Sequence, residues 1–84
     1  MKDAQYYDAL PWEVCIERDL RHGGTVYYIA RHPEFGELTG PVGTGESPEE
    51  ALTELRKARR SLIAVLLERD APIPEPGPVK IAVA

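Results

Sequence analysis

A glycine-rich stretch ahead of a predicted helix has the spacing of a phosphate-binding P-loop. Residues 40–47 read GPVGTGES, with Glu46 at the position where a P-loop carries its lysine. A P-loop binds phosphate through that lysine and through the free backbone N–H groups at a helix N-terminus. In this chain Glu46, Glu49 and Glu50 place negative charge at that terminus instead. Because these carboxylates repel phosphate, we expect the glycines to form a turn and Ser47 to cap the helix, with no bound nucleotide or other cofactor.

The two histidines and the single cysteine are the other residues with reactive side chains. His22 and His32 could carry protons or bind a metal, but the sequence places no cluster of further ligands with either of them. Cys15 alternates with Glu13 and Glu17, whereas a nucleophilic cysteine needs a base beside it. We therefore expect surface or supporting histidines, a semi-buried free thiol, and no catalytic or metal-binding residue.

Acidic residues near the predicted strands are too few for a nuclease of the ribonuclease H type, which needs several carboxylates around two metal ions. Glu13, Glu17 and Asp19 are the only acids there. Glu13 and Glu17 would lie about 13 Å apart along a strand that rises about 3.3 Å per residue. A nuclease is therefore the least favoured of the functions considered, and we expect the protein not to be an enzyme.

Composition indicates one small globular domain over residues 1–84. The chain is 43% hydrophobic and 29% charged, with a formal net charge of −4, whereas proteins that bind phosphate backbones carry a basic surface. The basic residues within 56–60 indicate a solvated helix face, and Trp12, Tyr27 and Tyr28 favour a core or interface role over base stacking. One cysteine excludes an intramolecular disulfide. With no signal peptide and no apolar run of about 20 residues, we expect a cytoplasmic protein.

A long amphipathic helix is the strongest structural signal in the sequence. Ser47 is placed as the N-cap, Pro48 at the first helical position, and Glu50 where it can complete a capping box. The spacing predicts a helix over Pro48–Arg69, roughly 33 Å long at about 1.5 Å per residue. Its apolar face is expected to comprise Ala51, Leu55, Ala58, Leu62 and Val65.

Four shorter segments should supply a sheet for this helix to cover. Residues 12–18 alternate in polarity as a half-buried strand does, and residues 25–32 are apolar on both faces. We expect a short third strand within Phe35–Gly45 and a fourth at Val79–Ala84. In the first strand, one face is expected to carry Trp12, Val14 and Ile16. The fold class predicted is α+β in the order β-β-β-α-β, with one long helix packed on a three- to four-stranded antiparallel sheet.

Several of these segments together resemble the HicB-like antitoxin family of bacterial and archaeal toxin–antitoxin pairs. Residues 45–52, GESPEEAL, look like the family's Gly-Asp-Thr-x-x-Glu-Ala motif and the helix that follows it. Pro33-Glu34 matches the family's proline-acid step, and residues 72–76, PIPEP, resemble the proline motif after the helix. The residues of the family motif and helix cap are Gly45, Ser47, Pro48, Glu49, Glu50 and Ala51.

The resemblance implies a partial ribonuclease H-like fold that lacks the nuclease centre. HicB-like proteins usually bind and block HicA, a small ribonuclease toxin with a double-stranded-RNA-binding-type fold, and they tend to form dimers or tetramers. Many carry a C-terminal DNA-binding segment; none is recognisable before Ala84, so we expect the single-domain form and no direct contact with nucleic acid or membrane. Contacts with a basic toxin are expected at Glu46, Glu49 and Glu50. The alternative is a stand-alone oligomeric structural or regulatory module without a cognate toxin.

Overall fold

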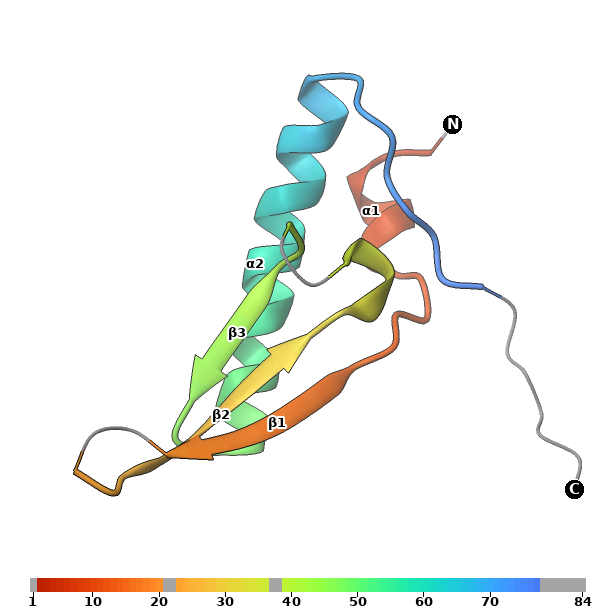
Figure 1. The fold of residues 1–84 in the computed structure, drawn as a ribbon. Helices are drawn as coiled ribbons and strands as arrows, with labels where there is room; N and C mark the ends of the chain where they lie inside the picture. Colours follow the sequence, from red (N-terminus) through yellow and green to blue (C-terminus); the bar gives the residue numbers. More distant parts are fainter. Residues whose placement is uncertain (1, 21–22, 37–38, 78–84) are drawn as a thin grey trace, which may run out of the picture.

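The computed structural model describes residues 2–20, 23–36 and 39–77, and they form one helix-on-sheet arrangement with a small helix at its side (Figure 1). In chain order the elements are α1 (Ala4–Asp8), β1 (Cys15–Leu20), β2 (Val26–Arg31), the 3-10 turn η1 (Pro33–Phe35), β3 (Val42–Gly45) and α2 (Pro48–Glu68). The strands form an antiparallel sheet in the order β1-β2-β3. The α+β class and the β-β-β-α order are confirmed. The expected strand at Val79–Ala84 lies outside the described residues.

Helix α2 begins and ends through local backbone chemistry. The Ser47 Oγ accepts a hydrogen bond from the Glu50 backbone N–H at 3.1 Å, and Pro48 occupies the first turn. The helix ends at Glu68, one residue before the predicted end. Asp70 follows with a φ of 52°, and the Ala71 N–H then bonds back to the Leu66 carbonyl at 2.9 Å. This is the Schellman pattern that satisfies carbonyls at a helix end.

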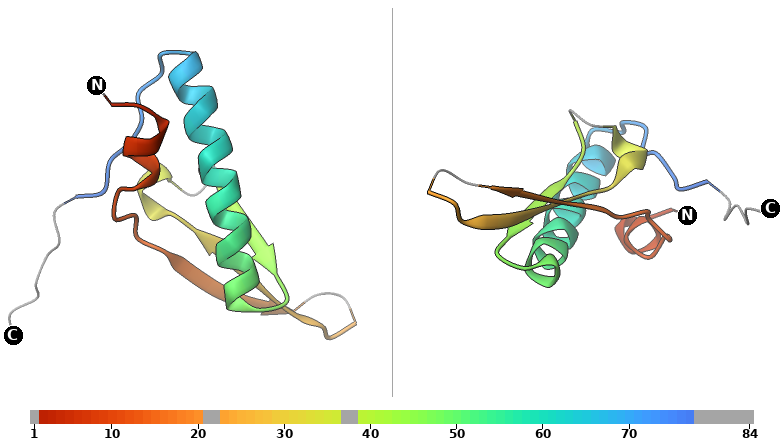
Figure 2. Two further views of the ribbon diagram at one scale, coloured as in Figure 1. Left: turned by 180° about the vertical axis from the view of Figure 1, so that it is seen from behind. Right: turned by 60° about the horizontal axis from the view of Figure 1, so that its bottom comes forward.

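The core lies where α2 crosses β2 and β3. Ala30 on β2 and Ala51 and Leu55 on α2 are fully buried, with Tyr28 and Leu52 packed against them. Figure 2 shows α2 on one face of the sheet only, from behind and from below. Because α2 covers only part of one face, β2 is not buried on both sides as its sequence predicts: Ala30 alone among its residues is fully buried, and Val26, on the same face as Ala30, is exposed.

Two glycines of β3 allow this close packing. A Cβ on Gly43 would overlap the Ala51 carbonyl oxygen and the Leu55 backbone nitrogen, and one on Gly45 would lie 2.7 Å from the Glu50 Cβ. No side chain larger than hydrogen fits between strand and helix at these positions. The expectation that these glycines form a turn was therefore wrong, because they are strand residues that face α2.

Strand β1 begins three residues later than its polarity pattern predicts. Trp12 precedes the strand and is buried: its Nε1–H donates to the Tyr7 carbonyl at 2.8 Å, and its ring stacks on Phe35 with centroids 4.9 Å apart. All six residues of β1 are exposed, including Ile16, so the prediction of a half-buried strand was also wrong. Helix α2 packs on β3 and β2 and leaves β1 uncovered.

Candidate functional site

A groove runs between the outer edge of β3 and helix α2. It encloses about 440 Å³. Val42 and Thr44 of β3 line one side, and the other side is lined by α2 residues Glu50, Glu54, Lys57, Ala58 and Ser61. These seven residues are called the β3–α2 groove below. Two of these α2 side chains, Ala58 and Ser61, are small.

The backbone edge that borders the groove belongs to an outer strand of the sheet. β3 pairs with β2 along one side, from Tyr28–Gly45 to Arg31–Val42. Within residues 2–20, 23–36 and 39–77, no other strand pairs with β3 on its second side. An edge strand with free N–H and C=O groups is able to bind an extended segment of another chain.

The groove is acidic at the end nearest the helix start. Glu50 and Glu54 lie one turn apart on α2, and Lys57 reaches Glu54 through an exposed ion pair of 3.4 Å. Of the three residues predicted to contact a partner, Glu50 lines the groove, while Glu46 and Glu49 are exposed at the same end of α2 without lining it. The sequence analysis selected these three acidic residues, and the fold places one of them, Glu50, beside the edge of β3.

A second exposed surface lies along β1. Ile16 pairs with Ala30, and Leu20 with Val26. Directly opposed residues share a face of the sheet, and Ala30 faces α2, so Ile16, Leu20 and Val26 lie on the α2 side of the sheet. Ile16 is 42% exposed and Leu20 is 67% exposed. We call these three residues the β1 strip; they form an uncovered apolar surface beside the helix.

The sequence analysis missed a buried polar network that joins α1, the turn η1 and α2. Asp8 Oδ1 accepts from Nε and Nη2 of Arg59 at 3.0 and 2.9 Å, and Asp8 Oδ2 accepts from Arg60 Nε at 3.1 Å. Arg59 Nη1 lies 3.1 Å from His32 Nε2. His32 is 1% exposed and Arg59 is 9% exposed. His32 is therefore not a surface residue, and of the two roles expected for it only the supporting one fits.

The tautomer of His32 follows from its two partners. A guanidinium only donates, so His32 Nε2 must accept from Arg59. Its Nδ1–H is then free to donate to the Glu13 carbonyl, 2.6 Å away. Burial lowers the pKa of His32, and the Arg59 charge lowers it further, although the bond to Glu13 acts in the opposite direction. The network therefore holds a neutral histidine.

The carboxylate of the same network is held in its charged form. Partial burial raises the pKa of Asp8, but the hydrogen bonds and charges of Arg59 and Arg60 outweigh it and lower the pKa below its ordinary value. Each side chain of the network therefore has a partner, and each contact holds two elements of the fold together. These contacts connect α2 to α1 and to Glu13, two residues before β1.

A sequence signal for this network did exist. The buried stripe of α2 is Ala51, Leu55, Arg59 and Ile63, spaced four residues apart. The predicted face had Ala58, Leu62 and Val65 along its centre with Ile63 at its flank, and it placed Arg59 on the solvent side, which was wrong. A charged residue in step with a buried stripe indicates a buried partner, here Asp8.

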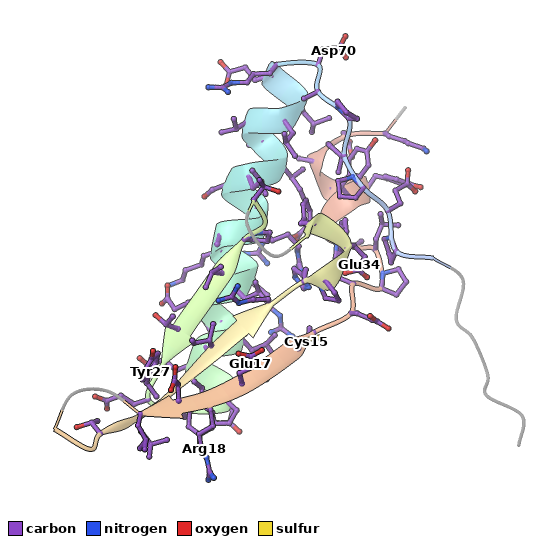
Figure 3. All side chains as sticks on the ribbon, in the orientation of Figure 1. Cys15, Glu17, Arg18, Tyr27, Glu34 and Asp70 are labelled. Carbon is purple, nitrogen blue, oxygen red and sulfur yellow. The ribbon has the colours of Figure 1, made fainter. Side chains whose placement is uncertain are left out.

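The remaining reactive residues do not converge. Cys15 lies on β1 at the edge of the sheet and is exposed rather than semi-buried (Figure 3), and His22 lies outside the described residues. In the part of the chain that the structure describes, no group of three or more His, Cys, Asp or Glu side chains could hold a metal ion. Glu13 instead contributes its backbone, whose N–H donates to Glu34 Oε2 at 2.9 Å.

Comparisons with protein-family models, curated proteins and solved structures gave no match to this chain. Among the described residues, no helix is both long and apolar enough to cross a membrane.

Proposed function

We propose that the chain is a HicB-like antitoxin-type protein that binds a small basic ribonuclease toxin of the HicA type and neutralises it by covering its working surface. The observation that supports this function is the β3–α2 groove, where an edge of β3 that no described strand pairs with lies beside the acids Glu50 and Glu54. The motif at residues 45–52 supplies the last residue of β3 and the start of α2, and one of its residues, Glu50, also lines the groove.

The proposed action is binding in the cytoplasm, without a cofactor and without catalysis by this chain. Opposite charge on the two proteins speeds their encounter and favours the correct orientation. A bound antitoxin then excludes RNA from the toxin by occupying the same surface. Glu46 and Glu49, exposed beside the groove, add to the attraction without having to lie in the contact itself.

Co-expression tests this function directly. The gene product encoded beside this chain, if it is small, basic and arrests growth, should be captured by the chain, and growth should recover. Glu50→Lys and Glu54→Lys, made as separate single variants, should each fail to restore growth, whereas Glu68→Lys, an equal charge change at the exposed far end of α2, should restore it. Absence of a complex with the wild-type chain would refute the antitoxin function.

Self-association is a second proposal, and the β1 strip supports it. A small domain that leaves Ile16 and Leu20 exposed gains stability when a second copy covers them. We expect a dimer or tetramer by light scattering after size exclusion, and a shift toward the monomer in Leu20→Lys. If the wild type oligomerises while the neighbouring gene product neither binds nor arrests growth, the chain is a stand-alone oligomeric module.

A further inference from the structure

We infer that the β3–α2 groove binds its partner by strand addition: an extended basic segment pairs with the free edge of β3 and places lysine or arginine side chains against Glu50 and Glu54. That this segment belongs to the toxin rests on the proposed function. The geometry of the binding mode rests on the groove alone.

The first support is that β3 packs directly against α2 before anything binds. Gly43 and Gly45 leave no space for a Cβ between β3 and α2, so strand and helix are in direct backbone contact. Such contact fixes the distance between the free edge of β3 and the acids on α2. A partner strand would meet a preformed edge and would not have to order it, which lowers the entropic cost of binding.

The second support is the charge of the groove. Glu50 and Glu54 are four residues apart on a helix, where like charges repel each other. Lys57 pairs with Glu54 only through an exposed contact of 3.4 Å, and exposed pairs of this kind are weak. Two acids with one weakly held lysine leave the groove negative. A cationic side chain between Glu50 and Glu54 would relieve the repulsion.

The same charges argue against a second copy as the occupant. In a symmetric pair, two β3 edges would meet and the two grooves would lie side by side, so that Glu50 and Glu54 of one copy would approach those of the other. Four acids would then share one interface with two lysines. A basic chain of different sequence fits the groove better, and self-association is left to the β1 strip.

The direct test is hydrogen exchange on the complex with the toxin. Strand addition should slow exchange of the outward-facing amides within Val42–Gly45, and β1, the other edge strand, serves as the internal reference whose amides should be unchanged. If a complex forms while the β3 amides exchange at their free rate, strand addition is wrong although the antitoxin function stands.

A peptide test decides the binding mode even if no toxin binds. A short peptide of alternating lysine and valine should bind, and the same peptide methylated on alternate backbone nitrogens should bind at least tenfold more weakly because it cannot complete the β3 ladder. Glu50→Gln and Glu54→Gln should each weaken binding by roughly two- to fivefold, with Glu68→Gln as the unaffected control. Equal binding of both peptides, or no binding of either, would overturn the inference.

Discussion

The two outer strands of the sheet are attached to the molecule in different ways. β3 contacts α2 backbone to backbone at Gly43 and Gly45. β1 is attached just before it begins, where the side chains of His32 and Glu34 bond to the carbonyl and the N–H of Glu13. The backbone contact with α2 holds β3 close to the helix, whereas β1 pairs with β2 along its length but is not covered by α2, so its side chains stay exposed. The difference explains why one edge borders a charged groove and the other an apolar strip.

Truncating one leucine that packs over β3 and one leucine on β1 should test this comparison most clearly. Leu55 is fully buried over β3, while Leu20 on β1 is 67% exposed. We expect Leu55→Ala to lower the free energy of unfolding by about 2–5 kcal/mol, and Leu20→Ala to change it by no more than about 0.5 kcal/mol. Urea denaturation of both variants measures the difference, and similar losses would show that α2 covers both strands.

Adding a single methyl group to β3 should have the next largest effect. In Gly43→Ala the new Cβ meets backbone atoms of Ala51 and Leu55, which cannot rotate away. We expect a loss of about 3 kcal/mol, at the upper end for overpacking. Gly77→Ala is the matched control, since a Cβ there meets nothing within 4 Å. If the two variants unfold at the same urea concentration, the close contact between β3 and α2 does not exist.

Acid should weaken the attachment of β1 through His32. Its folded pKa is lowered from 6.5, so the unfolded chain binds the proton more readily than the folded chain. Its contribution to stability is therefore complete above pH 6.5 and is lost as the pH falls from 6.5 through the lower folded pKa, by at most about 1.4 kcal/mol per pH unit.

Urea denaturation across this pH range should show a steeper loss of stability for the wild type than for His32→Gln. The comparison is between slopes, so an overall destabilisation of the variant does not obscure it. Asp8 does not interfere, because its pKa lies below 3.8 and its contribution is lost only at lower pH. Equal slopes would mean that His32 titrates in the folded protein as it does in the unfolded chain.

Removing the helix cap should have the smallest effect. Ser47→Ala deletes the acceptor for the Glu50 N–H and should cost about 1 kcal/mol. Ser61→Ala changes the same side chain at an exposed position within α2 and should be neutral or slightly stabilising, because alanine favours helix. A loss in Ser61→Ala equal to that in Ser47→Ala, measured by thermal denaturation, would argue against a specific capping role.

The start and end of α2 could be predicted closely, whereas its orientation could not. The capping serine and the proline after it act within one turn, so their neighbours in sequence are sufficient to define the helix start. The rotation of the helix about its axis depends on what it packs against. Arg59 is turned inward by Asp8, which is 51 residues away in sequence, and the predicted face missed it.

In the candidate site too, the residue types could be predicted from the sequence, whereas their position relative to β3 could not. The acids Glu46, Glu49 and Glu50 stand out in the sequence because a P-loop would have a lysine among them. Their relation to the edge of β3 could not be predicted, since the same glycines suit a turn and a close strand–helix contact equally well. Only the packing of α2 on β3 distinguishes the two roles.

The amino-acid sequence by itself determined the order of strands and helix and the cap that starts α2. These features depend on the periodicity of hydrophobic residues and on hydrogen bonds between residues close in sequence, and both can be recognised in short segments of the chain. The tertiary structure alone decided which strands the helix covers, that His32 is buried, and which strand edge lies beside the acids. Those outcomes depend on volume and charge brought together from distant parts of the chain, and no local pattern specifies them.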